Sequence, residues 1–504
     1  MVDLRPDQLA TVLAILQAKV PECEVWAFGS RAKWTAKDKS DLDLALVSSE
    51  RIPLSKLGRL REAFTDSYLP MSVDVVDIHR VSDEFRRIIE SQKVVLQKAS
   101  ASPTADTDRS KWQTLPLEAC LETIIDYRGK TPTKVSKGIP LITAKVVKNG
   151  RIETPDEFIA EEDYEGWMRR GFPQAGDVLL TMEAPLGEVA QLDDRKVALA
   201  QRLVALRGKR DLLDNWYLKY LLQSDLVQDQ LRARATGTTV LGIKQSELRK
   251  INLTLPPLDE QRAMAQVLGA LDDKIELSRR MNETLEALAQ SLFKSWFVDA
   301  TQSALPKGWR EESLDQVVKF LNGLALQKFP AIGDNSLPVI KIAQLRAGNT
   351  DGADQASSQV PAEYVIEDGD VIFSWSGSLE VELWCGGRGA LNQHLFKVSS
   401  KQFPKWFYFL WTRHHLPEFQ AIAADKATTM GHIQRKHLTQ AKVFVPPPPE
   451  LKKMSETMSP LIEKLIANKL ESRTLAALRD ALLPKLLSGE LRVPAAAPLV
   501  EARA

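Results

Sequence analysis

Two stretches of the chain place apolar residues at alternating steps of four and three, the spacing of a coiled-coil seam. In residues 256–300 the seam positions are Met264, Leu268, Leu271, Ile275, Ser278, Asn282, Leu285, Ala289, Leu292 and Trp296. In residues 446–490 the seam recurs at an offset of 190 residues as Met454, Met458, Leu461, Leu465, Asn468, Ser472, Leu475, Arg479, Leu482 and Leu486. Both stretches open on prolines, which the first turn of a helix tolerates. The pattern predicts two long helices of about 40 residues, or ~60 Å each.

A polar layer interrupts both seams and suggests how the helices pair. Ser278 and Asn282 in the first helix become Asn468 and Ser472 in the second, so the order is reversed. An antiparallel pair about a pseudo-twofold axis would place Asn282 opposite Asn468 and Ser278 opposite Ser472. A buried asparagine pair would then fix the register at some cost in stability. The alternative is two unrelated amphipathic helices.

Prolines inside the second helix qualify this prediction. Pro460 could kink the helix, or could begin a new one with Ser459 as its cap.

The repeat extends beyond the helices into residues 111–255 and 301–445, which we call the first and second globule. Trp112 aligns with Trp309, and LAQRLVAL, which begins at Leu199, aligns with LNQHLFKV, which begins at Leu391. Short alternating strands with Gly/Asp turns predict an α+β domain in each globule. An aromatic helix is expected near 214–233 and again near 404–422, with Trp216 and Trp406 in the core.

Residues 1–98 predict a separate small α/β unit. A helix is followed by a short strand at 24–28, a second strand over 71–77 and a helix near 82–92. Between them, Gly29-Ser30 is followed by Asp41 and Asp43, which would share one face of a strand. Asp74 on a neighbouring strand would add a third carboxylate, and such a cluster suits Mg²⁺ with substrate phosphates. The Gly-Ser turn lets a phosphate approach the backbone, so this pattern is typical of metal-assisted nucleotidyl transfer.

Composition narrows the class of protein. The 504 residues are 44% hydrophobic and 26% charged with a net charge of +1, which neither requires nor excludes nucleic acid. No apolar run is long enough to span a membrane, and Cys23, Cys120 and Cys385 are too far apart in sequence for a metal site. We therefore expect a reduced cytoplasmic protein of several domains without zinc and without a membrane partner. Residues 99–110 have the composition of a flexible linker, and 491–504 form a tail.

The motifs GSRA, SDLDL and VDVVD, beginning at Gly29, Ser40 and Val73, closely resemble the minimal nucleotidyltransferase domain of the polymerase-beta superfamily. The resemblance implies that Gly29 and Ser30 hold nucleoside triphosphate phosphates and that Asp41, Asp43 and Asp74 hold Mg²⁺. Asp74 would also act as the general base. Many members have a glycine near Trp34. The alternative is an inactive domain retained for an interaction.

The rest of the chain resembles the specificity subunit of type I restriction–modification systems. The resemblance rests on Thr238-Thr239, Ile243, Leu248 and the segment LPPLDEQ ending at Gln261. These residues recur as Thr428-Thr429, Ile433, Leu438 and a proline run ending at Glu450, with Leu451 in place of Gln261. This resemblance implies that each globule reads one half of a bipartite sequence in double-stranded DNA without a cofactor. The helix pair would set the spacing and dock two methyltransferase subunits, which carry S-adenosylmethionine.

Motifs for the chemistry of such a complex are absent from this sequence. There is neither a glycine-rich cofactor loop nor a P-loop, so methyl transfer would belong to the methyltransferase subunits and translocation and cleavage to restriction subunits. The subunit itself would be non-catalytic. The rival hypotheses are a metal-dependent nucleotidyltransferase targeted by the two globules, and a pure scaffold.

Candidate DNA contacts are basic and polar residues on turns within the globules, since these residue types position proteins on phosphates and read base edges. For any one of them, a solvated surface charge is the plainer interpretation. The candidates are Arg128, Lys130, Lys134, Lys145 and Lys148 in the first globule, and Lys328, Lys341, Arg346, Arg388, Gln434, Arg435 and Lys436 in the second.

Overall fold

The computed structural model describes residues 2–37, 40–48, 51–67, 69–98, 109–127, 131–237, 240–331, 335–425 and 431–493. They group into two compact units: unit 1 comprises Met1–Thr107 with Phe329–Leu337 and Gln355–Gln359, and unit 2 the remainder. Several residues named above lie outside the described part of the chain: Arg128, Lys130, the pairs 238–239 and 428–429, and most of the linker and tail. No helix in the described part is long and apolar enough to cross a membrane.

Unit 1 is built on a four-stranded sheet in the order β3-β2-β1-β4. Strands β2 and β3 are parallel, whereas β1 is antiparallel to both β2 and β4. The elements are α1 (Pro6–Lys19), β1 (Glu24–Phe28), α2 (Gly29–Ala32), β2 (Leu42–Val47), α3 (Leu54–Thr65), β3 (Val73–Asp77), α4 (Asp83–Gln92) and β4 (Val94–Gln97).

Helices cover both faces of this sheet because successive residues of a strand point to opposite sides. Val25 and Ala27 of β1 join a core with residues of α1 and α3, such as Leu16 and Leu60. Trp26 and Phe28 of the same strand form a second core with Ile89 of α4.

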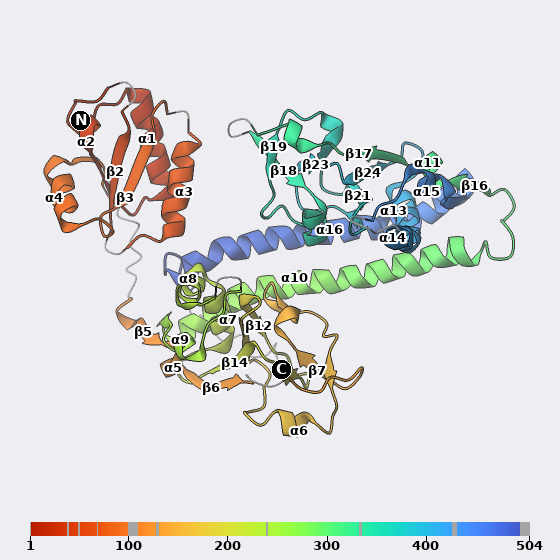
Figure 1. Ribbon diagram of the computed structural model, residues 1–504, viewed down its shortest axis with the longest axis horizontal. Coiled ribbons are helices and arrows are strands. Elements are labelled where there is room, and N and C mark those ends of the chain that lie inside the picture. Colours follow the sequence, from red (N-terminus) through yellow and green to blue (C-terminus); the bar gives the residue numbers. More distant parts are fainter. Residues whose placement is uncertain are drawn as a thin grey trace. The chain divides into compact units, whose positions relative to one another are not determined.

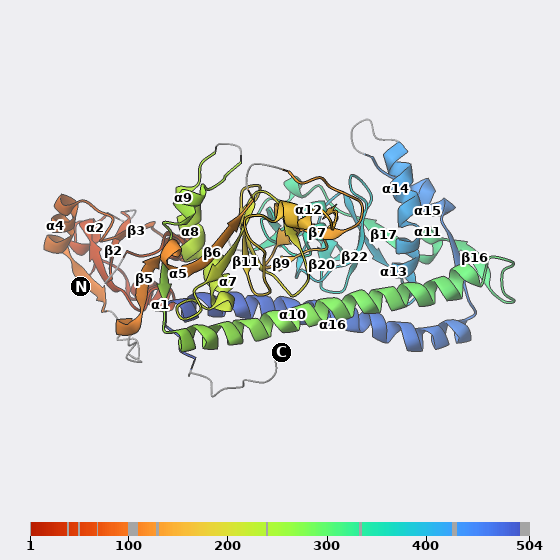
Figure 2. The same ribbon diagram turned by 90° about the horizontal axis from the view of Figure 1, so that it is seen from below.

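Unit 2 is organised around two long helices, α10 (Leu258–Phe293) and α16 (Pro448–Leu487), which lie side by side in Figures 1 and 2. They run antiparallel, since Asp272 contacts Arg479 while Asn282 contacts Asn468. Their 36 and 40 residues correspond to ~54 and ~60 Å. A wider π-helical turn, η3 (Lys294–Asp299), extends α10.

The first globule contains an antiparallel sheet in the order β12-β11-β14-β6 and a smaller sheet β10-β7-β13. Its core includes Met264 and Leu268 of α10 and Leu486 of α16, so the globule rests on both helices. The elements are β5 (Gln113–Pro116), α5 (Leu117–Cys120), β6 (Leu121–Asp126), β7 (Ile139–Ile142), β8 (Val147–Lys148), β9 (Arg151–Ile152), β10 (Phe158–Ile159), α6 (Tyr164–Trp167), β11 (Val178–Met182), β12 (Leu186–Gln191), β13 (Ala198–Leu199), β14 (Leu203–Gly208), α7 (Asn215–Gln223), α8 (Asp225–Arg234), α9 (Gln245–Leu248) and β15 (Asn252–Leu255).

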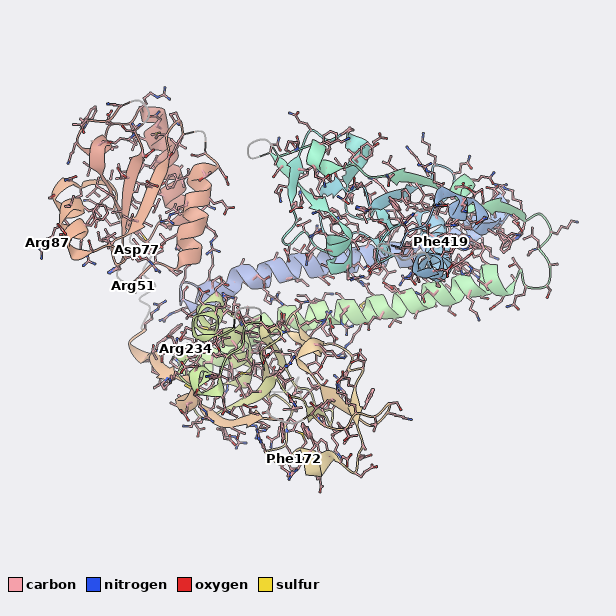
Figure 3. The ribbon with its side chains drawn as sticks, viewed as in Figure 1. Arg51, Asp77, Arg87, Phe172, Arg234 and Phe419 are labelled. Atoms are coloured by element: carbon pink, nitrogen blue, oxygen red, sulfur yellow. The ribbon has the colours of Figure 1, made fainter. Side chains whose placement is uncertain are left out.

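The second globule repeats this plan with the sheet β17-β24-β21-β22, and Val339 and Ile340 of β18 pair in parallel with β23. Its core includes Phe293 and Phe297 near the end of the first long helix and Met458 of α16. Phe419 of α14, labelled in Figure 3, stacks on Phe373 with ring centroids 5.8 Å apart. The elements are β16 (Arg310–Ser313), α11 (Leu314–Val317), β17 (Lys319–Asn322), β18 (Ser336–Ile340), α12 (Ile342–Ala347), β20 (Val365–Ile366), β21 (Val371–Ser374), β22 (Val381–Leu383), β23 (Gly389–Leu391), β24 (Leu395–Ser399), α13 (Lys405–His414), α14 (Leu416–Asp425), α15 (Arg435–Gln440) and β25 (Lys442–Val445).

The strand that begins each globule pairs with the strand that ends it. Strand β5 is antiparallel to β15, and β16 is antiparallel to β25. The chain therefore enters and leaves each globule at adjacent points.

Three details differ from the sequence-based expectations. α16 continues through Pro460 without a break. Each expected aromatic helix is two helices, and the first pair is divided at Ser224, whose extended backbone cannot continue α7. Trp406 is buried as expected, whereas Trp216 is 39% exposed, so the core prediction for Trp216 is wrong. The neighbouring residues Tyr217 and Leu218 fill that core instead.

Candidate functional site

The polar layer of the helix pair lies in the middle of an otherwise apolar contact. The Asn468 Nδ2 donates to Asn282 Oδ1 at 2.9 Å, and the Asn282 Nδ2 donates to the carbonyl of Leu465 at 3.3 Å. Both side chains are buried, as is Ser278, while Ser472 is half-buried. The asparagine contact is the one expected from the reversed polar layer, and it satisfies amides that would be costly to bury unpaired.

Arg479, the charged residue in the second seam, belongs to an ion-pair cluster between the first globule and both helices. Its guanidinium donates to Asp272 Oδ1 at 2.8 Å, while Lys219 and the Tyr220 hydroxyl donate to Asp272 Oδ2 at 2.7 and 2.8 Å. Burial alone would raise the pKa of Asp272, but the charges of Lys219 and Arg479 outweigh it and lower that pKa. The carboxylate is therefore held ionised where α7, α10 and α16 meet.

The proline-rich segment at the start of each long helix ties that helix to its globule. The Trp112 Nε1 donates to Glu260 Oε2 at 2.9 Å, and the Trp309 Nε1 donates to Glu450 Oε2 at the same distance. Gln261 is buried and bridges the Leu212 carbonyl and the Asp214 amide that precede α7. Leu451 replaces Gln261 in the second copy and packs against the apolar core instead. These positioning roles were missed by the sequence reasoning, although the aligned tryptophans and glutamates were a visible signal.

Most of the basic candidates for DNA contact form exposed ion pairs within their own globule. Lys145 contacts Asp156 and Glu157, whose side-chain hydrogen bonds raise the pKa of the lysine. Lys134 contacts Glu157, Lys148 contacts Glu153, Lys341 contacts Asp354, Arg346 contacts Glu380 and Arg388 contacts Glu367. Exposed pairs of this kind are weak and exchange readily with phosphates. Gln434, Arg435 and Lys436 are exposed around the start of α15, and Lys328 is exposed near β17.

In unit 1 the predicted nucleotide site lies where β1 ends and α2 begins. Gly29 has φ +74°, and a Cβ there would lie 2.3 Å from Asp43 Oδ2, so only glycine fits. Asp43 of β2 is directly opposite Asp74 of the parallel strand β3, and Asp41 immediately precedes β2. The structure therefore brings Gly29, Asp43 and Asp74 together, with Ser30 as the second residue of α2.

The carboxylates of this site repel one another. Burial raises the pKa of Asp43, and the charges of Asp74 and Asp41 raise it further. Within the described residues no three His, Cys, Asp or Glu side chains are arranged to hold a metal ion, so the cluster as it stands is not a formed metal site. Its donor set still suits a hard divalent cation, because carboxylate oxygens are the ligands that Mg²⁺ prefers.

Nearby acidic and aromatic residues have different roles. Asp77, labelled in Figure 3, is buried and accepts the backbone amides of Ile52 and His79, each at 2.9 Å, so it supports the loops rather than the site. Trp34 is 63% exposed and has φ +59°, and Thr35 N–H donates to the Ser30 carbonyl at 3.0 Å. This is the helix-ending geometry in which glycine is usual, and a bulky residue there costs about 1 kcal/mol.

Two family models match this chain. The family model described as type I restriction modification DNA specificity domain matches residues 112–287 and 306–474. Because these segments cover more than half of the chain, the chain belongs to this family. A second model, described as polymerase beta, nucleotidyltransferase, matches residues 13–101. Both resemblances noted in the sequence are confirmed.

One relative matches most of this chain and another matches its N-terminal part. The type I restriction enzyme MjaIX specificity subunit of Methanocaldococcus jannaschii is 28% identical over 400 residues, covering 72% of this chain and 90% of that protein. The probable protein adenylyltransferase MntA of Haemophilus influenzae is 47% identical over 106 residues, covering 20% of this chain and 93% of that protein. The crystal structure of a type I restriction–modification S subunit from M. genitalium aligns over 74% of this chain and 96% of that one, with 17% identity and a TM-score of 0.47.

Proposed function

We propose that this chain is the DNA-sequence-recognition subunit of a type I restriction–modification complex. The observation that carries the proposal is the duplication: two globules of the same plan are attached to one antiparallel helix pair. Two reading surfaces on such a frame suit a bipartite site, with one half read by each globule. DNA recognition itself requires no cofactor in this proposal.

The helix pair would fix the gap between the half-sites and carry the partners. Apolar side chains remain exposed on it, namely Leu277, Met281 and Leu288 of α10 and Leu478 of α16. Exposed apolar residues gathered on one pair of helices are typical of protein contacts. We assign this surface to two methyltransferase subunits, which would supply S-adenosylmethionine, and we expect restriction subunits to join them in the cytoplasm.

Genome-wide mapping of methylated adenine tests this function. Cells would express the full chain with its cognate methyltransferase subunit. We expect a methylated bipartite motif. Replacing the first globule with that of another family member should remove one half of the motif, and replacing the second globule should remove the other half. A stable complex that methylates no defined motif would contradict the proposal.

A second activity is favoured by the carboxylate cluster of unit 1. We infer that residues 1–98 transfer a nucleotidyl group from a nucleoside triphosphate to a hydroxyl group, with release of pyrophosphate. Asp41, Asp43 and Asp74 would hold Mg²⁺, which would neutralise their repulsion and the charge of the phosphates. Gly29 and Ser30 would bind the triphosphate, and Asp74 would accept the proton of the attacking hydroxyl. Support comes from the Gly29–Asp43 approach and from the likeness to a relative named as a probable protein adenylyltransferase.

Calorimetric titration of the full chain with ATP and Mg²⁺ tests this activity, together with transfer of α-labelled ATP to protein. We expect binding and labelling by the native chain and loss of both in Asp43→Asn. The matched control is Asp66→Asn, an exposed aspartate at the end of α3. Labelling that survives in Asp43→Asn would refute the assignment.

A further inference from the structure

Both globules contain one corner with the same backbone hydrogen bonds. In the first globule Met182 N–H donates to the Arg202 carbonyl at 2.7 Å, and Ile243 N–H donates to the Met182 carbonyl at 3.0 Å. In the second globule Trp375 N–H donates to the His394 carbonyl at 3.3 Å, and Ile433 N–H donates to the Trp375 carbonyl at 3.1 Å. In both globules, therefore, the end of a central strand contacts the turn before the next strand and the residue two positions before α9 or α15 in the same way.

The side chains on these two corners differ, although the frames match. We define the first corner as Asp126, Glu183, Gln201, Arg202 and Lys244, and the second as Asn322, Ser376, Gln393, His394 and Gln434. Asp126 pairs with Val204 in the sheet, and Asn322 pairs with Phe396 at the equivalent position. The first corner is thus charged, with two carboxylates and two cations, whereas the second carries amides, a hydroxyl and an imidazole.

The second corner holds its polar side chains in a fixed arrangement beside a pocket of about 190 Å³. The Trp375 Nε1 donates to Asn322 Oδ1 at 2.9 Å, and the Trp375 ring lies 6.1 Å from the ring of His394. The buried Ser376 hydroxyl lies 2.9 Å from His394 Nδ1. Gln434 and Asn322 line the pocket and are exposed. Side chains held in this way are preorganised to discriminate between ligands.

The first corner shows a different sign of specialisation. Arg202 is exposed and has φ +69°, a left-handed backbone that costs a non-glycine residue of order 1 kcal/mol or more. The adjacent Gln201 Nε2 donates to Thr131 Oγ1 at 3.1 Å, which orients that amide. A strained, exposed arginine beside an oriented amide is expected where contact with a ligand offsets the strain.

We propose that these two corners are the base-reading sites of the chain, one for each half of the bipartite DNA site; this rests on the proposed DNA-recognition function. Arginine and lysine pair with guanine edges, glutamine and asparagine pair with adenine edges, and carboxylates accept from cytosine. Matching frames with unlike side chains are what two different half-sites require. Lys145, Lys148 and Lys341, which already contact carboxylates, would contact the phosphate backbone and carry little sequence information.

Reciprocal substitutions in the full chain, expressed with its methyltransferase partner, test this assignment by genome-wide mapping of methylated adenine. The variants are Gln434→Lys and His394→Ala in the second corner, and Lys244→Gln and Arg202→Ala in the first. Lys442→Ala is the matched control, since Lys442 is an exposed residue of β25 in the second globule, belongs to neither corner and contacts Glu311. Thermal unfolding of each variant complex and the salt dependence of its DNA binding are measured in parallel.

We expect Gln434→Lys and His394→Ala to relax or change one or two positions of one half-site, while the other half-site and the salt dependence stay as in the native complex. Lys244→Gln and Arg202→Ala should relax or change one or two positions of the opposite half-site. An unchanged motif in all four folded variants would overturn the proposal, and so would a uniform loss of methylation at both halves. If the native complex itself methylates no motif, the proposed function fails instead. If His394→Ala unfolds, Gln434→Lys on the exposed rim decides the question.

Discussion

At the scale of single residues, the asparagine pair is the clearest compromise between stability and specificity. Asn282 and Asn468 place amides where leucine would pack, and each amide finds its partner on the opposite helix. Apolar residues there would strengthen the contact between the helices. They would also lower the free-energy cost of sliding one helix along the other.

Asn282→Leu should lower the free energy of unfolding of unit 2 by about 1–3 kcal/mol, because it leaves the buried Asn468 amide without its acceptor. The double variant Asn282→Leu with Asn468→Leu should recover most of that loss. Urea denaturation followed by circular dichroism measures both. Thr284→Ala, on the exposed side of the same helix, is the control and should change stability by less than about 0.5 kcal/mol. If Asn282→Leu lowered the free energy of unfolding no more than Thr284→Ala does, the role given to the asparagine pair would be contradicted.

Asp43 presents the opposite case, since it weakens the fold that contains it. Because burial and its carboxylate neighbours raise its pKa, ionised Asp43 is destabilising at neutral pH. Asp43→Asn should therefore slow amide hydrogen exchange in β2 and β3 when Mg²⁺ is absent. Added Mg²⁺ should slow exchange in the native chain and have little effect on the variant. Faster exchange in the variant without Mg²⁺ would mean that Asp43 supports the fold rather than a site.

At the scale of elements, the first globule is fastened to the helix pair by charge as well as by apolar packing. Asp272 receives bonds from Lys219, Tyr220 and Arg479, so removing its charge leaves the buried Lys219 without its carboxylate and leaves Arg479 with Asp480 alone. Asp272→Asn should cost ~3 kcal/mol in the stability of unit 2, as expected when one partner of a buried ion pair is removed. Arg479→Leu should cost less, because it leaves the Lys219 contact intact and restores the apolar seam.

The pH dependence of this contribution has a definite sign. Since the fold lowers the pKa of Asp272, its contribution is fully present above the ordinary carboxylate pKa and is lost as the pH falls through the lowered value. The stability difference between the native chain and Asp272→Asn should therefore be constant from pH 8 to pH 5 and shrink below about pH 4. Denaturation curves of the two proteins across this range measure it. A difference that grows in acid would show that the cluster has been misassigned.

Particular elements show which features of the fold could be predicted from the sequence and which could not. The heptad spacing and the reversed polar layer were sufficient for the long helices and the asparagine contact, because both depend on helix periodicity alone. Pro460 was ambiguous, since only packing along α16 decides whether a proline interrupts a helix. Trp216 was misplaced because side-chain direction within a short helix is set by its globule, and Ser224 ends that helix earlier than the aromatic pattern indicated.

In the functional sites, too, some features could be predicted from the sequence and others could not. The closeness of Gly29, Asp43 and Asp74 was predictable, because it follows from strand alternation and a single turn. The ion pairs of Lys145 and Lys341 were not predictable, because their carboxylate partners lie on other turns of the globule. The corners were invisible in the sequence for a related reason: their members come from separate segments joined only by the sheet.

At the scale of unit 2, the distance between the recognition globules depends on helix length. The Asp272–Arg479 contact belongs to the first globule, while Glu286 and Arg473 contact Arg413 and Asp368 of the second. Inserting one heptad between Lys274 and Ile275 and another between Leu475 and Ala476 would lengthen the frame by about 10 Å without disturbing either set.

We expect this double insertion to widen the gap between the two methylated half-sites by about three base pairs, since the rise of duplex DNA is about 3.4 Å per base pair. The half-sites themselves should be unchanged. Mapping of methylated adenine in the variant complex measures the gap. A heptad inserted into α10 alone is the control and should abolish methylation, because it breaks the seam. An unchanged gap after the double insertion would exclude the helices as the determinant of spacing.

The pairing of β5 with β15 and of β16 with β25 has a consequence for heredity. Because each globule begins and ends at neighbouring strands on the frame, a gene segment encoding one globule can be exchanged at those strands while the helices keep their register. Recombination between related genes at these boundaries would give a host lineage a new target sequence in a single event, with the partner subunits inherited unchanged. Repeated exchanges of this kind would let a population diversify its target sequences faster than point mutation of either corner allows.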